Sequence, residues 1–157
     1  DGVMRAVSLS ISFPNYRMFF KKRNDYPNWD WAVIEIKANV LWEMECDFFQ
    51  TNAASRKFTG QSRQSPKLGY FKSMFAEKMG SGILRKNLKV PQEYPTDPQA
   101  EVLVYGRIDP SLFVAINVDG TDIFETVKGR IGRHQFPIRN AQVLFKPRQD
   151  YAHWRES

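Results

Sequence analysis

Apolar and polar residues alternate with a period of two along several stretches of the chain, which is the pattern of half-buried β-strands. In residues 101–106, Val102 and Val104 share one face, and Leu103 and Tyr105 share the other. Strands are predicted over residues 5–12, 31–37, 101–106, 112–118, 122–127 and 141–145. A hairpin turn at Asp119-Gly120 is predicted between the fourth and the fifth of them.

Helix-like patterns gather in the first half of the chain. Pro14-Asn15 interrupts the first strand, and residues 16–23 favour a short helix with Asn15 as its N-cap. The other segments, in chain order, are a brief helix in 38–46, an irregular or short helical segment in 47–55, the most helix-like stretch in 67–79 and an ordered, proline-containing loop in 87–98. Short strands combined with such helices indicate a single α+β domain over residues 1–157.

The composition is typical of a folded domain, because 42% of the 157 residues are hydrophobic and 14% are aromatic. No apolar run approaches the length of a membrane span, so no membrane association is predicted. With one cysteine and two distant histidines, no disulfide and no metal site are predicted. The chain begins within a strand-like stretch and without an initiator methionine, so we expect it to be a piece of a longer protein.

The net charge of +6 is concentrated in one segment. Residues 56–89 carry nine basic residues and one acidic residue, a net charge of +8, which leaves −2 for the remainder of the chain. Such a local excess favours binding to a polyanion, above all a nucleic acid. The residues predicted to bind it are Arg56, Lys57, Arg63, Lys67, Lys72, Arg85 and Lys86.

The aromatic residues admit two interpretations. Phe58, Tyr70, Phe71 and Phe75 are interleaved with the basic residues, where they could stack on bases or could face the core of the domain. Three tryptophans in the first half of the chain are expected in the core, namely Trp29, Trp31 and Trp42. Tyr151 and Trp154, near the C-terminus, are expected to pack back onto the domain.

The candidate chemistry is confined to one short motif. The chain has no G-x-S-x-G motif, no P-loop and no G-x-G-x-x-G motif, and Cys46 lies between two acids that disfavour its thiolate. Gln99 and Glu101 are two residues apart at the start of a strand, so they are expected on the same face. A carboxylate there could stabilise a cationic sugar centre, or it could be an ordinary surface acid.

Three stretches carry a resemblance to a known family. PTDPQAEVLVYGRIDPSLFVAI resembles the closing motif of the DarT family, toxin ADP-ribosyltransferases that modify single-stranded DNA with NAD as the donor. AVSLSISFPNYRMFF is similar to the early strand, proline break and helix of that family, and DFFQTNAASRKF to the segment before its DNA-facing loop. The resemblance covers most of residues 5–118.

The resemblance implies an ADP-ribosyltransferase-like split, mixed β-sheet with flanking helices. It also implies that Glu101 is the catalytic glutamate and that Gln99 helps to orient the acceptor. Ser12, Asn15 and Tyr16 would border the NAD pocket, although a capping role for Asn15 is an alternative. The basic region 56–98 would be the substrate-recognition loop and helix region.

The family further implies a bacterial, cytoplasmic toxin that uses NAD as co-substrate without a metal. Its partners would be single-stranded DNA, usually modified at thymine, and a macrodomain antitoxin of a toxin–antitoxin pair, with an anti-phage role. The oligomeric state is left open. The alternatives are a non-catalytic nucleic-acid-binding module and an ADP-ribosyltransferase that acts on RNA or protein.

One departure from the family pattern concerns the NAD pocket. The NAD-binding His-x-Thr strand of the family and an arginine implicated in catalysis lie before the first strand found here, and no histidine precedes His134. We therefore expect the domain to be N-terminally incomplete in this chain.

Overall fold

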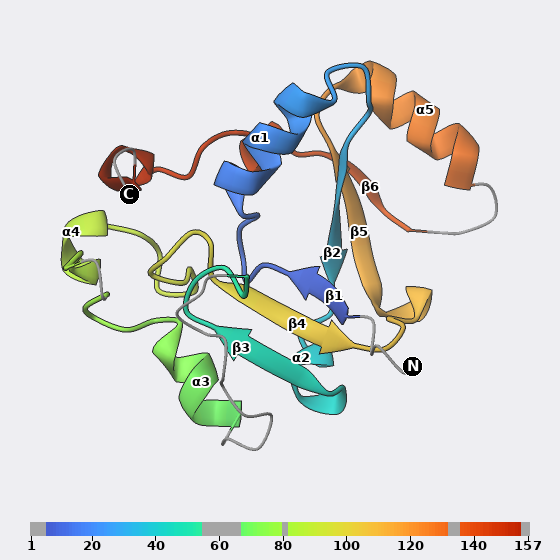
Figure 1. The fold of residues 1–157 in the computed structure, drawn as a ribbon. Helices are drawn as coiled ribbons and strands as arrows, with labels where there is room; N and C mark the ends of the chain where they lie inside the picture. The colour runs from blue at the N-terminus through green and yellow to red at the C-terminus, as the bar shows by residue number, and fades with distance from the viewer. Residues whose placement is uncertain (1–5, 55–66, 80–81, 132–135, 155–157) are drawn as a thin grey trace.

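Two small sheets form the framework of the computed structural model, which describes residues 6–54, 67–79, 82–131 and 136–154 (Figure 1). Within these residues, the first sheet has the strand order β1-β4-β3, with both pairs antiparallel. The second sheet has the order β2-β5-β6, in which β2 and β5 are antiparallel and β5 and β6 are parallel. The strands are β1 (Ala6–Leu9), β2 (Ala32–Ile36), β3 (Cys46–Phe49), β4 (Glu101–Tyr105), β5 (Phe113–Val118) and β6 (Ile138–Asn140). The expected α+β class and the split, mixed sheet are confirmed.

The main core lies on one face of the first sheet. Val102 and Val104 of β4 are fully buried, as their alternation predicts, and they pack with Phe48 of β3. Val40 of α2 (Val40–Glu43) and Met74, just after α3 (Lys67–Ser73), complete this cluster. The alternate residues of β4, which include Glu101, are only partly buried and face the other way.

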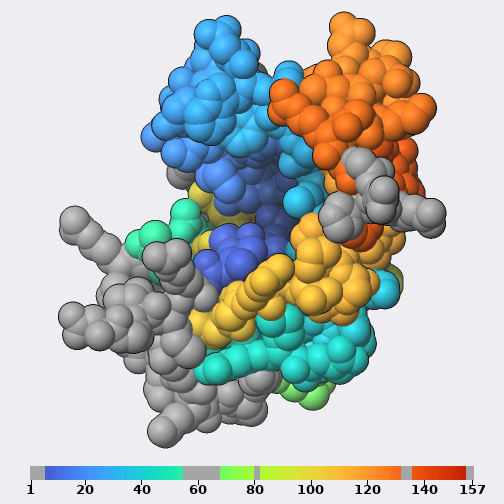
Figure 2. All heavy atoms as spheres, turned by 90° about the vertical axis from the view of Figure 1, so that its right-hand side faces the viewer, coloured from blue at the N-terminus to red at the C-terminus, as the bar shows by residue number. Residues whose placement is uncertain are grey.

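Helix α1 (Tyr16–Asp25) begins where the sequence predicts, because the Asn15 side chain accepts a hydrogen bond of 3.1 Å from the Met18 N–H. The expected N-cap is thus confirmed. Helix α1 packs on the short 3-10 helix η3 (Gln142–Phe145), and the region of α1 stands beside α5 (Thr121–Ile131) at the top of the face in Figure 2. The remaining short elements are α4 (Arg85–Leu88), η2 (Pro110–Leu112) and η4 (Tyr151–Trp154).

The predicted strand over 122–127 is wrong, because this segment belongs to helix α5. Gly120 has a φ of 115°, a conformation that favours glycine, and there the chain turns into a helix instead of a hairpin. The helix exposes its polar side chains and half-buries an apolar stripe of period 3.6, consisting of Ile123, Phe124, Val127 and Ile131.

The expectation for residues 47–55 is also wrong in part. Residues 46–49 form β3, and they alternate buried Cys46 and Phe48 with partly buried neighbours because they pair with β4. The predicted strand over 141–145 is η3 instead, which buries Phe145, while the last strand is β6, just before it. These segments take their structure from distant partners.

Helix α3 is shorter than the predicted 67–79. The Ser73 carbonyl accepts a hydrogen bond of 3.0 Å from the Gln50 side chain, and the Met74 carbonyl accepts one of 2.9 Å from the Thr96 N–H. These tertiary bonds satisfy carbonyls that a continued helix would use, so the helix ends at Ser73. The predicted stop at 80–82 falls partly outside the described residues.

Across the described ranges, no helix is both long and apolar enough to cross a membrane.

Candidate active site at the start of strand β4

The carboxylate of Glu101 is held by two donors at the start of the central strand of the first sheet. Ser8 of β1, a diagonal neighbour across the strand pair, donates its hydroxyl to one carboxylate oxygen. The Ala53 N–H, from the chain after β3, donates to the other oxygen at 2.8 Å. Glu101 is only partly buried, so the carboxylate is oriented by the protein while part of the residue stays accessible.

Most of the segment that leads into Glu101 is buried, and hydrogen bonds hold it in place. Thr96 is fully buried, and its hydroxyl donates to the Ala76 carbonyl at 2.8 Å. The Asp97 carboxylate accepts a hydrogen bond of 2.7 Å from the Gln99 N–H, and the Ala100 N–H donates to the Asp97 carbonyl at 3.1 Å. Asp97 therefore fixes the turn from which β4 begins.

Two arginines bind the carbonyls of this segment, one from before it in the sequence and one from after it. Arg148, with 2% of its surface exposed, donates to the Pro95 carbonyl at 2.8 Å and to the Thr96 carbonyl at 2.9 Å. Its charge is balanced by the buried Asp150 at 2.6 Å, which also accepts a hydrogen bond from the Trp154 indole. The expectation that Trp154 packs back is confirmed, whereas Tyr151 is 42% exposed.

Arg85 holds the other end of the same segment. Its guanidinium donates to the Tyr94 carbonyl at 2.8 Å and to the Thr96 hydroxyl at 3.1 Å. The second nitrogen donates to the carbonyls of Pro91 and Gln92. The ordered loop predicted for 87–98 is thus observed after α4, and Arg85 has a structural role in it whether or not it also binds nucleic acid.

Gln99 lies in the turn, since β4 begins at Glu101. Strand alternation therefore does not relate the side chains of these two residues, as it was expected to do. A role of Gln99 in orienting the acceptor stays a prediction.

The three residues predicted to border the NAD pocket lie together between β1 and the first turn of α1. Ser12 is exposed and has a φ of 60°, and Asn15 donates its N–H to the Ser10 hydroxyl at 3.1 Å. Tyr16 is buried; its burial, followed by the negative charge of Asp150, raises the pKa of its phenol to about 12. Tyr16 therefore stays protonated, and binding of NAD by these residues stays a prediction.

The residues predicted to bind nucleic acid are only partly within the described ranges. Lys72 of α3 and Lys86 of α4 are exposed, and Lys67 begins α3. Arg56, Lys57, Arg63 and Phe58 lie outside the described residues. The other aromatic side chains of this region, Tyr70, Phe71 and Phe75, pack against the main core, so the core-facing alternative is the observed one.

Three residues that shape the site were not predicted from the sequence. Ser8 lies in the predicted first strand, and its polarity inside an apolar alternation was the only available indication. Arg148 and Asp150 lie in a charged tail, where nothing in the local sequence distinguishes a buried ion pair from a solvated one.

Within the described residues, no three His, Cys, Asp or Glu side chains come together in a way that could hold a metal ion.

Burial raises the pKa of Asp97, against the opposing effects of the Gln99 N–H, the Thr51 hydroxyl and two arginines. The folded protein therefore keeps the proton of the Asp97 carboxyl group above pH 3.8, where the unfolded chain releases it. Stability should accordingly fall as pH rises from about 4 through the folded-state pKa, since the folded state binds more protons there. Asp97→Asn should remove this fall in urea unfolding curves measured between about pH 3.5 and 7.

A matched control for this experiment is Asp122→Asn, which alters an exposed carboxylate of α5. It should keep the wild-type dependence of stability on pH. If Asp97→Asn kept the wild-type dependence of stability on pH, the assignment of this dependence to Asp97 would be contradicted.

Comparison with known proteins shows the family to which this chain belongs. A family model described as "ssDNA thymidine ADP-ribosyltransferase, DarT" matches residues 11–154. No protein of curated function matches the chain by sequence. Among solved structures, the chain is similar to Thermosipho africanus DarTG in complex with ADP-ribose, with a TM-score of 0.54 and 17% identity. The match covers 89% of this chain and 35% of that chain, so the chain spans about a third of that protein's length. Because the family model covers nearly all of it, the chain belongs to the DarT family of single-stranded-DNA thymidine ADP-ribosyltransferases, which are NAD-dependent enzymes.

Proposed function

We propose that this chain carries the catalytic glutamate of an enzyme that transfers ADP-ribose from NAD to a thymine base of single-stranded DNA, and that this glutamate is Glu101. The observation that supports the proposal most is the carboxylate fixed by Ser8 and the Ala53 N–H at the start of β4. The family supplies the reaction, and the geometry supplies a residue suited to it.

The proposed role of Glu101 is electrostatic. NAD supplies the ADP-ribose group, whose anomeric carbon becomes positively charged as the bond to nicotinamide breaks. The carboxylate has lone pairs beyond the two that its donors use, and these can accept a hydrogen bond from a ribose hydroxyl. Because Ser8 and Ala53 already fix its orientation, little reorganisation is needed when the charge develops.

The acceptor in this proposal is a ring nitrogen of thymine. In a duplex the pairing edge of the base is hidden, so a transferase without a base-flipping device requires a single strand. The region 56–98 would bind that strand, with Lys72 and Lys86 among the exposed cations of its described part. RNA, protein and a purely binding role are the competing possibilities.

The test is transfer of radiolabelled ADP-ribose to a matched panel of substrates. It should include a thymine-containing single strand, the same strand in a duplex, the uracil-containing RNA and a mixture of unrelated proteins. Labelling of the DNA single strand alone supports the proposal. Labelling of RNA or protein instead would assign the other transferase activity, and binding without labelling would leave only a binding module.

The exposed lysines should contribute binding energy that depends on salt. Replacing both Lys72 and Lys86 with alanine should weaken single-strand binding and reduce the dependence of log K on log salt by about 0.7 for each phosphate that is no longer neutralised. Fluorescence anisotropy over a series of salt concentrations measures this slope. Lys128→Ala, which removes an exposed lysine of α5, should leave the slope unchanged.

We further infer that the enzyme is the toxin of a toxin–antitoxin pair, with a macrodomain protein that removes ADP-ribose as its partner and defence against phage as its use. DNA modified on a base edge would block replication, which accounts for toxicity. Expression in a bacterial host should arrest growth in a manner that requires Glu101, and co-expression of a macrodomain hydrolase should restore growth. Growth arrest that persists in Glu101→Gln would contradict this role.

A further inference from the structure

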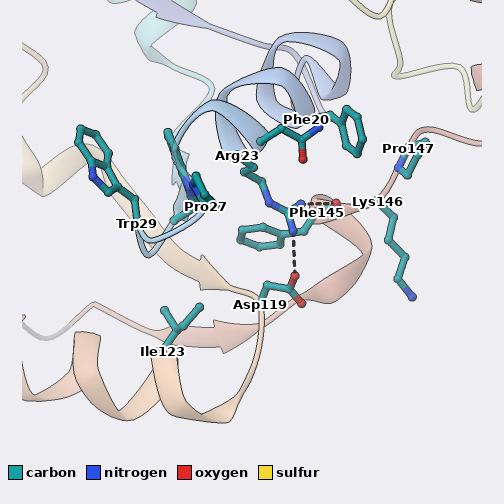
Figure 3. Close-up of a pocket in the computed structure, with 11 residues that line it drawn as sticks. Phe20, Arg23, Pro27, Trp29, Asp119, Ile123, Phe145, Lys146 and Pro147 are labelled. Atoms are coloured by element: carbon teal, nitrogen blue, oxygen red, sulfur yellow. Dashed lines mark hydrogen bonds and ion pairs between the residues drawn. The ribbon is translucent and has the colours of Figure 1, made fainter.

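A hollow away from Glu101 lies between helix α1, the residues just before strand β2, the start of helix α5 and the C-terminal segment (Figure 3). It has a volume of about 400 Å³, within the range of about 300–1,000 Å³ typical of ligand pockets. Its walls are the last turns of α1 and the residues after it, the Trp31 that precedes β2, the first turn of α5 and residues 145–147. No residue of the Glu101 site lines it.

Exposed aromatic rings form the rim of this hollow. Trp29 is 62% exposed and Phe20 is 60% exposed, so the expectation that Trp29 belongs to the core is wrong. The Trp29 ring stacks on Tyr26 with centroids 4.6 Å apart, and Trp31 follows at 6.0 Å. Large rings in this position offer flat apolar surfaces to a planar ligand.

Polar groups lie on the floor of the same hollow. Arg23 donates to the Phe145 carbonyl at 2.6 Å and forms an ion pair of 3.5 Å with Asp119, both of which Figure 3 marks. Its guanidinium also lies 5.5 Å from the centre of the Phe145 ring. Asn24 and the exposed Lys146 add further hydrogen-bonding groups to the lining. The hollow therefore combines aromatic faces, both donors and acceptors, and cations.

We propose that this hollow is a second binding site for the single-stranded DNA, where it binds a nucleobase that flanks the modified thymine. Trp29 and Phe20 would stack on the base, Asp119 and Asn24 would bond its edge, and Lys146 would bind a phosphate. Aromatic rings interleaved with cations are the usual means of binding single strands. The inference rests on the proposed function, because it takes single-stranded DNA as the substrate.

Two structural connections link the hollow to the Glu101 site, which the same DNA strand would have to reach. Helix α1 starts at Tyr16, near Asp97 and Arg148, and reaches the hollow at Arg23, a rise of about 10 Å. The C-terminal segment lines the hollow with Pro147, and the next residue, Arg148, bonds the loop that leads into Glu101. Binding in the hollow is thus positioned to align the strand relative to Glu101.

The test compares Trp29→Ala with Trp29→Tyr and with Trp42→Ala. Trp42 on α2 is 68% exposed, so the expectation that it belongs to the core is also wrong. It lies outside the hollow and is therefore a matched control for the loss of an exposed indole. Trp29→Ala should weaken binding of a single strand of about 12 nucleotides by about 5- to 150-fold, the effect of losing one stacked base. Trp29→Tyr keeps a ring and should stay within about threefold of wild type, and Trp42→Ala should match wild type.

Anisotropy measured without NAD separates this inference from the proposed function. Equal binding of the DNA strand by Trp29→Ala and Trp42→Ala, both with wild-type melting curves, would overturn the proposed second binding site whatever the transfer assay shows. Conversely, selective weakening in Trp29→Ala would support it even if no transfer occurs. In the transfer reaction, Trp29→Ala should raise the KM for the strand and leave kcat within about twofold, whereas Glu101→Gln should lower kcat.

Discussion

Glu101→Gln should lower the rate of ADP-ribose transfer by at least about 100- to 1,000-fold, the usual effect of removing a group that stabilises transition-state charge. The substitution removes the negative charge but keeps the shape of the side chain. The amide oxygen can still accept from the Ala53 N–H, and the amide NH₂ can donate to the Ser8 hydroxyl after that hydroxyl rotates. Binding of single-stranded DNA and the melting temperature should therefore stay close to wild type.

The control for this variant is Glu93→Gln, which changes an exposed acid in the loop before β4. It should transfer ADP-ribose at the wild-type rate. If Glu101→Gln kept more than about a tenth of the wild-type rate, or lost DNA binding along with activity, the catalytic assignment would fail. Measurements of kcat and of oligonucleotide affinity on the same preparations distinguish a loss of catalysis from a loss of DNA binding.

Arg148→Met should destabilise the folded protein by about 3–5 kcal/mol, the cost of breaking a buried ion pair. The arginine side chain is 2% exposed and that of Asp150 is not exposed at all. Removing the guanidinium leaves the buried Asp150 carboxylate without its cation, and it leaves the Pro95 and Thr96 carbonyls without this donor. Urea unfolding measures the loss, and transfer activity should fall as well because the loop leads into Glu101.

Arg139→Met offers a comparison in which the ion pair is exposed. Arg139 lies 2.7 Å from Glu35, but both side chains are about half exposed, so the loss should stay below about 1 kcal/mol. The double variant Arg148→Met/Asp150→Leu should recover part of the stability, because no uncompensated charge remains. Equal stability of Arg148→Met and Arg139→Met would contradict the structural role given to Arg148.

The parts of the structure that depend on local sequence were predictable. The alternation in β4, the start of β2 and the capping of α1 by Asn15 each follow from neighbouring residues. Glu101 was proposed from its place at a strand start and from the family resemblance, and its position at the start of β4 is observed.

The parts that depend on distant partners were not predictable. Strand β3 exists because it pairs with β4, some fifty residues later in the chain, and α3 ends where Gln50 and Thr96 bond the carbonyls of Ser73 and Met74. The bonds from Arg148 to the Pro95 and Thr96 carbonyls likewise join segments more than fifty residues apart. The local sequence of a charged tail or of a proline-rich loop does not indicate such a long-range contact.

The α5 error has a different cause, because its helical period was present in the sequence. The Asp119-Gly120 pair favoured a hairpin, yet the residues after it space their apolar side chains three to four apart. The turn residues fixed a change of direction and not the type of element that followed.

Mass spectrometry of a single strand that contains one thymine, after incubation with NAD, is the sharpest test of the role given to Glu101. It should be run with this chain and with a longer version that carries any residues encoded upstream, each as wild type and as Glu101→Gln. We expect the addition of one ADP-ribose to the thymine by the wild-type protein and no addition by Glu101→Gln. Modification that survives in Glu101→Gln, or that falls on another base, would contradict the assignment of this glutamate and of its substrate.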